Sequence, residues 1–166
     1  MFKGMIDRRI EQGHNLLKIE TFANNNAYNT SIPNEGEQAW NNATFFIDVN
    51  PRFLEKVDDH MQYLTSKGMV VSIAQGVGIS MKNISVEPDH KRLARYILAR
   101  HGVYPTGWII AQEFHNVRFG VCVQCWVDVA AYVYNLDPYK RANSSHNAYT
   151  NSGVYHDQIW YGFGTL

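Results

Sequence analysis

Apolar runs of strand length and amphipathic stretches of helix length alternate along this chain. In the helical stretches apolar residues recur at intervals of three and four, whereas the strand stretches are short and compact. Alternation at this spacing predicts strands joined by right-handed helical crossovers, and therefore a parallel sheet in an α/β fold. No linker or low-complexity segment interrupts the pattern, so a single domain over residues 1–166 is expected.

The helices and strands are predicted from periodicity and from their terminating residues. The helices are expected at Met1–Gln12, from Asn50-Pro51 to Gly68, from Pro88 to Gly102 and at about Val121–Asn135. The strands are expected at Asn15–Phe22, Met69–Ala74, Trp108–Glu113, Arg141–Asn147 and Ile159–Leu166. Two polar loops are expected, at Asn24–Ala43 and Gln75–Glu87, and loops of such length are usually functional or disordered.

The strand Trp108–Glu113 carries the strongest functional signal. Its apolar run ends abruptly in Gln112 and Glu113. A carboxylate directly after a buried strand is costly unless it is paired, solvated or used in chemistry. In a (β/α) barrel, catalytic groups stand at the carboxyl ends of strands. Glu113 is therefore the candidate reactive acid, and the alternative is a structural glutamate that pairs with Arg100 or Arg118.

The order of the predicted elements favours an incomplete barrel. The pattern starts on a helix and stops on a strand, whereas a closed (β/α)8 barrel takes roughly 200 residues or more. An open Rossmann-like sheet is the alternative, but neither glycine-rich phosphate-binding motif follows a strand in this sequence. An incomplete TIM barrel, with its strands in a parallel sheet and its helices outside, is the predicted fold.

Composition limits the partners and cofactors. Lys plus Arg and Asp plus Glu both number 15, so no basic face for nucleic acid is indicated. No apolar stretch is long enough to span a bilayer, and the amino-terminal residues are too charged for a signal peptide. Cys122 and Cys125 form a C-x-x-C without a second ligand pair, so they are interpreted as small helix residues, with a redox pair as the alternative. No metal or other cofactor is expected, and the sequence does not indicate an oligomeric state.

Ordered motifs along the chain resemble one protein family. The motifs are Arg9-x-x-x-Gly13-x-Asn15, Asn50-Pro51-x-Phe53-x-x-x-Val57-Asp58, Gly68-Met69-Val70-Val71, Ala94-Arg95-Tyr96-x-x-x-Arg100-His101-Gly102, Trp108–Glu113, Asp137-Pro138-Tyr139, Ser144-Ser145-His146 and Trp160-Tyr161-x-Phe163. In order and spacing they resemble the apiosidase-like glycoside hydrolases, which have a TIM-barrel catalytic domain. The resemblance implies that this chain corresponds to about barrel strands two to six. It also implies a plant or microbial polysaccharide or oligosaccharide as substrate and favours an extracytoplasmic location.

The resemblance also implies roles for particular residues. The related retaining enzymes use two carboxyl groups about 5 to 5.5 Å apart, with the acid/base after the fourth barrel strand and the nucleophile after the seventh. Glu113 matches the acid/base, and the nucleophile would lie beyond Leu166. Gln112 stands where these enzymes often have an asparagine that binds a sugar hydroxyl, although neighbours on a regular strand face opposite sides unless the strand bulges. The further candidates for substrate binding are His146, His115, Asn15 and Trp40.

Several alternatives remain open from sequence. A metal-dependent barrel hydrolase would use His14, Glu113, His115 and His146. A non-catalytic carbohydrate-binding barrel would retain the aromatic loops but lack a paired carboxylate. Lys18 and Glu20 are expected to share a face, either as a simple ion pair or toward a substrate, and the ion pair is favoured.

Overall fold

The computed structural model describes residues 2–21, 24–25, 30–31, 39, 49–74, 86–112 and 123–146. Within these ranges the chain forms four helices, α1 (Phe2–Glu11), α2 (Pro51–Ser66), α3 (Val86–His101) and α4 (Val123–Leu136). The strands are β1 (Leu16–Glu20), β2 (Asn24–Asn25), β3 (Thr30–Ser31), β4 (Val70–Ala74), β5 (Thr106–Gln112) and β6 (Asn143–His146). None of the helices in these ranges is long and apolar enough to cross a membrane.

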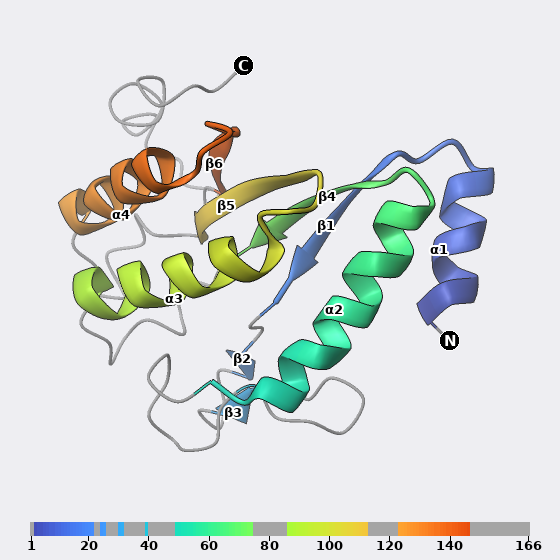
Figure 1. Ribbon diagram of the computed structural model, residues 1–166, viewed down its shortest axis with the longest axis horizontal. Helices are drawn as coiled ribbons and strands as arrows, with labels where there is room; N and C mark the ends of the chain where they lie inside the picture. The colour runs from blue at the N-terminus through green and yellow to red at the C-terminus, as the bar shows by residue number, and fades with distance from the viewer. Residues whose placement is uncertain are drawn as a thin grey trace, which may run out of the picture.

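The four longer strands form one parallel sheet in the order β1-β4-β5-β6. Each strand lies beside the next one along the chain, so the helical crossovers all turn the same way and cover the same face. Figure 1 shows α1 and α2 at one end of this arrangement and α4 with β6 at the other. The result is the predicted α/β architecture, a partial barrel with its helices on the outside.

Two observations place the hydrophobic core between the helices and one face of the sheet. Val71 and Ile73 of β4 are fully buried and belong to the same hydrophobic cluster as buried residues of α2, α3 and α4. On the opposite face, Leu16 and Val70 are paired in register and remain 54% and 40% exposed. We call these the helix-covered face and the open face. An open face of this kind is unusual for a parallel sheet, which is normally covered on both sides.

Local sequence signals explain most of the element boundaries. The side chain of Asn50 accepts a hydrogen bond from the backbone N–H of Arg52 at 3.0 Å, and Pro51 takes the first helical position of α2. Gly68 has a φ of +78°, a conformation that glycine adopts without strain, and it follows the end of α2 as predicted. Every predicted helix, and every predicted strand that falls within the described ranges, is present.

Several predicted bounds differ from those in the structure, and three of the differences are informative. The segment Asn24–Ala43 was predicted to be a loop throughout, but it contains the short antiparallel pair β2 and β3. The strand predicted to begin at Trp108 begins at Thr106, because Val71 and Ser72 of β4 pair with Thr106 and Gly107. The helix predicted to start at Pro88 starts at Val86. The predicted strand Ile159–Leu166 lies outside the described residues.

Candidate active site

The carboxyl ends of the four parallel strands meet at one edge of the sheet, which we call the carboxyl edge. Gln112 ends β5 and His146 ends β6, and their Cα positions are paired in register. The structure therefore brings the positions of two predicted site residues together. Glu113 follows Gln112 directly in sequence, but Glu113, His115 and Trp40 lie outside the described residues.

A β-bulge interrupts β5 shortly before this edge. Ile109 pairs with Ser144 and Ala111 with Ser145, so Ile110 is an extra residue on the β5 side. Ile110 and Ala111 are both fully buried in the core, where a regular strand would alternate faces. Gln112 and Glu113 could face the same side of the sheet only if the strand bulged at these residues. The observed bulge precedes both of them. The bulge determines which side of the sheet each residue after Ile110 faces, but it does not put Gln112 and Glu113 on the same side.

The first half of β5 is fixed to the carboxyl end of α4. Trp108 is buried, and its indole Nε1–H donates to Oδ2 of the fully buried Asp137 at 2.9 Å. Arg141 donates from Nη1 to Oγ1 of Thr106 at 2.6 Å and from Nη2 to the carbonyl of Gly102. Its guanidinium also lies 5.5 Å from the centroid of the Trp108 ring. These contacts make the base of β5 a rigid support for its carboxyl end.

Side-chain hydrogen bonds hold the short polar strand β6 in place. The buried amide of Asn143 donates from Nδ2 to the carbonyl of Ala130 in α4 at 3.2 Å. The hydroxyl of Ser144 donates to the carbonyl of Trp108 at 3.4 Å. Asn and Ser have low strand propensity, so these contacts account for a strand that propensity supports only weakly.

At the β1 end of the sheet, Lys18 and Glu20 form the favoured ion pair. Their Nζ and Oε1 atoms are 3.5 Å apart, and both side chains are about two-fifths exposed, which confirms that interpretation. The next residue, Thr21, is buried, and its backbone N–H donates to the carbonyl of Ala74 at 3.3 Å. Within the described part of the chain the Thr21 hydroxyl has no hydrogen-bond partner. Sequence reasoning missed Thr21, although a polar residue directly after a strand is the available signal.

Asn15 and His14 lie at the opposite edge of the sheet. Both precede β1, and the carbonyl of Asn15 accepts a hydrogen bond from the backbone N–H of Val70, the first residue of β4. The structure therefore does not bring Asn15 together with Gln112 and His146. The same placement separates His14 from His146, which the metal-dependent alternative had grouped together.

Arg100, the proposed structural partner of Glu113, is bonded to Asp58 instead. Its Nε lies 2.9 Å and 3.0 Å from the two carboxylate oxygens of Asp58, and its Nη2 lies 2.6 Å from Oδ2. The buried His101 adds a contact between Nε2 and Oδ1 of Asp58 at 2.9 Å. This cluster joins α2 to the carboxyl end of α3, and sequence reasoning did not predict it.

The titration of this cluster follows from its contacts. Burial acts to raise the pKa of Asp58, but the hydrogen bonds from Arg100 and His101 outweigh it and hold that pKa below its ordinary value. Burial lowers the pKa of His101, and the carboxylate of Asp58 offsets this only in part. His101 is therefore a neutral imidazole that donates to a charged carboxylate at neutral pH.

A second buried histidine lies between α3 and α4. His90 is fully buried, and its ring centroid is 4.5 Å from that of the buried Trp126 at an angle of 59°. Burial lowers the pKa of His90 to about 3. Both residues lie near the starts of their helices, which follow β4 and β5 in the chain. His90 thus serves as a neutral packing element between α3 and α4.

The structure bears on both the cysteine pair and a possible metal site. Cys125 is disulfide-bonded, and Cys122 is the other cysteine of the sequence. Cys125 lies in α4, as the preferred interpretation had it, but it forms a disulfide and is not merely a small packing residue. Among the residues that the structure describes, no group of three His, Cys, Asp or Glu side chains is arranged to hold a metal ion.

Comparison with known proteins identifies a family and a fold. The sequence model of the family described as "Apiosidase-like, catalytic domain" matches residues 1–166. No curated protein is significantly similar to the chain. A glycoside hydrolase family 5 structure from Bacteroides vulgatus superposes with a TM-score of 0.72 at 12% identity, covering 96% of this chain and 34% of its own. A structure described as a glycoside hydrolase gives 0.70 at 14% identity, with coverage of 88% and 32%.

A further Bacteroides vulgatus structure is 21% identical, with a TM-score of 0.63 and coverage of 82% of this chain and 30% of its own. At these identities the likeness establishes the fold alone. The chain spans about a third of the length of the structures that it matches.

Proposed function

Because the chain belongs to the apiosidase-like family of catalytic domains, we propose that it forms part of a glycoside hydrolase. Its substrate is a plant or microbial polysaccharide or oligosaccharide, cleaved by two carboxyl groups with retention of configuration. Glu113 is the general acid/base, and the nucleophile lies outside residues 1–166. The observation that supports this proposal is that β5 ends at Gln112 beside the end of β6, at the carboxyl edge, and that Glu113 is the next residue in the sequence.

The chemistry assigns a definite proton path to Glu113. In the first step its carboxyl group donates a proton to the glycosidic oxygen while the nucleophile attacks the anomeric carbon and the leaving sugar departs. In the second step the carboxylate accepts a proton from the water that attacks the same carbon. Such an acid needs a raised pKa, which burial or the neighbouring carboxylate supplies.

Gln112 and His146 bind sugar hydroxyl groups in this proposal. Their paired positions at the ends of β5 and β6 support a joint role, because the two strand ends are neighbours at the carboxyl edge. The bulge and the Trp108–Asp137 contact give these strand ends a fixed backbone, which positioned catalytic groups require. His115 and Trp40 remain proposed substrate contacts, and Asn15 is not part of this site.

The test is the Glu113→Gln substitution in the whole protein that contains this chain. Turnover of a natural glycan should fall about 10²- to 10⁴-fold, the usual contribution of a positioned proton donor. The first step on an activated aryl glycoside should change far less, since its leaving group needs little protonation. Glu55→Gln, the same change at an exposed residue of α2, is the matched control and should leave both rates unchanged. Equal losses on the two substrates would argue against an acid at position 113.

A further inference from the structure

A groove of about 680 Å³ lies between α1 and α2, apart from the carboxyl edge. This volume is within the range of small-molecule sites. The residues that line it come from both helices, and they are Phe2, Lys3, Asp59, His60, Gln62, Tyr63 and Ser66. Figure 1 shows α1 and α2 at the end of the molecule opposite α4 and β6. The groove is therefore separate from the proposed active site.

The sequence of α2 creates the wall of this groove. Its apolar residues, among them Val57, Met61 and Leu64, are buried against the sheet. A second stripe at positions 59, 62, 63 and 66 follows the spacing i, i+3, i+4, i+7, and lines the groove on the side toward α1. Polar side chains fill this second stripe, so the helix presents an apolar face to the core and a hydrogen-bonding face to α1.

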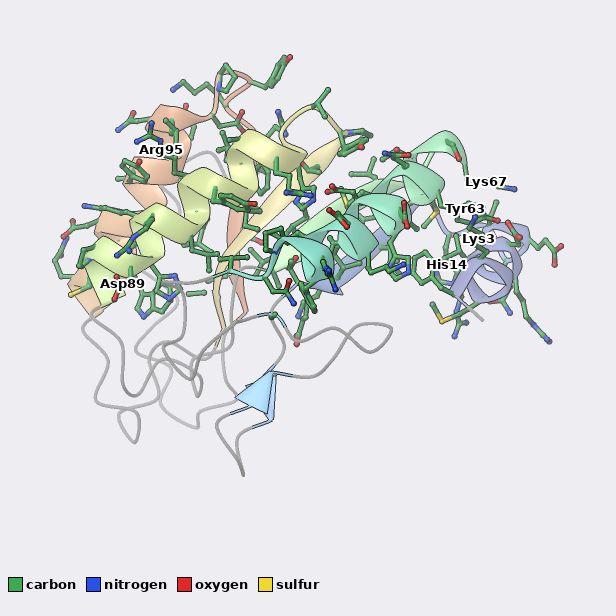
Figure 2. All side chains as sticks on the ribbon, turned by 60° about the horizontal axis from the view of Figure 1, so that its bottom comes forward. Lys3, His14, Tyr63, Lys67, Asp89 and Arg95 are labelled. Carbon is green, nitrogen blue, oxygen red and sulfur yellow. The ribbon has the colours of Figure 1, made fainter. Side chains whose placement is uncertain are left out.

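Polar contacts hold α1 beside α2. The hydroxyl of Tyr63 donates to Oδ1 of Asp7 at 2.6 Å, and Nζ of Lys67 lies 3.2 Å from the same oxygen. The ammonium groups of Lys3 and Lys67 lie 5.1 Å and 5.3 Å from the centroid of the Tyr63 ring. Figure 2 shows Lys3, Tyr63 and Lys67 gathered where the two helices meet. Of the residues of α1, all of which are described, Ile6 alone is fully buried, so most of this helix remains at the surface beside the groove.

From these contacts we propose that the groove binds a short neutral saccharide as a second carbohydrate site. Asp59 offers acceptors, Gln62 offers both donors and acceptors, and both side chains are exposed. Sugar hydroxyl groups donate and accept at once, so they match such a mixed set. The half-buried rings of Phe2 and His60 stack on each other with centroids 3.8 Å apart, and they add an aromatic part to the lining that the apolar side of a sugar ring can contact.

The charges in the groove disfavour other ligand classes. The lining carries one ammonium group, on Lys3, and one carboxylate, on Asp59. A phosphate or another small anion would gain from the first and be repelled by the second. The lining is too polar for a purely apolar ligand, which would leave the hydrogen-bonding groups of Asp59 and Gln62 without partners. A neutral polyhydroxylated ligand is not repelled by the carboxylate of Asp59, and it offers hydrogen-bond partners to Asp59 and Gln62.

The test is a titration of the 166-residue chain with cellotriose and xylotriose, followed by backbone amide NMR. Shifts are expected at Asp59, Gln62 and Tyr63, with a Kd on the order of 1 mM for at least one trisaccharide. The substitutions Asp59→Ala and Gln62→Ala should each weaken binding about tenfold or more. Asp128→Ala, which removes a carboxylate of α4 remote from the groove, should leave the Kd unchanged. Circular dichroism checks that each variant is folded.

Each result decides the proposal. Trisaccharide-dependent shifts in the groove that both variants weaken would support it. Shifts confined to the carboxyl edge, a stronger response to inorganic phosphate than to either sugar, or no shift at ~20 mM trisaccharide, well above the expected Kd, would overturn it. Because the titration needs no turnover, its outcome is independent of the proposed catalytic role of Glu113.

Discussion

The Asp58→Asn substitution should lower the free energy of unfolding by about 2–3 kcal/mol. An exposed ion pair contributes about 0–1 kcal/mol, whereas removing one partner of a fully buried pair costs about 3–5 kcal/mol. Asp58 and Arg100 each keep 26% of their side-chain surface exposed, so their pair lies between these limits. The fully buried imidazole of His101 loses a charged acceptor, and a weakened buried hydrogen bond adds about 1 kcal/mol.

The pH dependence of unfolding gives the same cluster a second signature. The pKa of His101 is lowered on folding, so the unfolded chain binds a proton that the folded chain does not, and stability falls as pH drops below 6.5. The pKa of Asp58 is also lowered, so its contribution is present above 3.8 and is lost as pH falls toward the folded-state value. Protonation of either group therefore lowers the free energy of unfolding in acid. In the Asp58→Asn variant, the decrease that begins near pH 4 should be absent.

Urea unfolding at pH 7 and at pH values below 3.8, with thermal scans at pH 7, measures both effects. The predicted loss corresponds to a fall in Tm of about 4–12 °C for a domain of this size. Asp59→Asn changes the adjacent exposed carboxylate and should stay within about 0.5 kcal/mol of the original protein. A loss below about 0.5 kcal/mol for Asp58→Asn would refute the inference that this cluster ties α2 to α3.

Three further predictions test the burial and hydrogen bonding of individual side chains in the core. Trp108→Phe removes the indole N–H that donates to the buried Asp137, and should lower the free energy of unfolding by about 1–3 kcal/mol in urea titrations. His90, whose burial lowers its pKa to about 3, should stay neutral down to about pH 4 in NMR titrations, so a midpoint near 6.5 would contradict its burial. Asn143 begins an N-x-S sequon, but its amide is buried and donates to the carbonyl of Ala130. Its peptide should remain unmodified by mass spectrometry after expression in a glycosylating host.

Much of the fold could be predicted because local signals and tertiary packing agree. The pair Asn50-Pro51 and the glycine at 68 define α2 from sequence alone, and the structure has the same boundaries. Strand bounds that depend on pairing with a distant segment were predicted less accurately. The start of β5 at Thr106 depends on a partner in β4, and the short pair β2–β3 has no periodicity to detect.

The candidate site was predictable in outline but not in detail. That Gln112 and His146 end neighbouring strands followed from the strand–helix alternation, because parallel strands share a carboxyl edge. Asn15 lies at the edge of the sheet opposite Gln112 and His146, because it precedes β1, which begins at Leu16. The Asp58–Arg100–His101 cluster joins residues over 40 positions apart, a distance that no local pattern bridges.

The extra residue in β5 makes this strand sensitive to its length. Side chains along a strand alternate between faces, so each inserted or deleted residue inverts every position downstream until the chain leaves the sheet. Ile110 already produces one such inversion. Deleting Ile110 would restore regular pairing with β6, and the side chains after it would then face the opposite side of the sheet. The same deletion in the segment after Gln112 would leave that phase intact, so homologues should vary in length after β5 far more readily than within it.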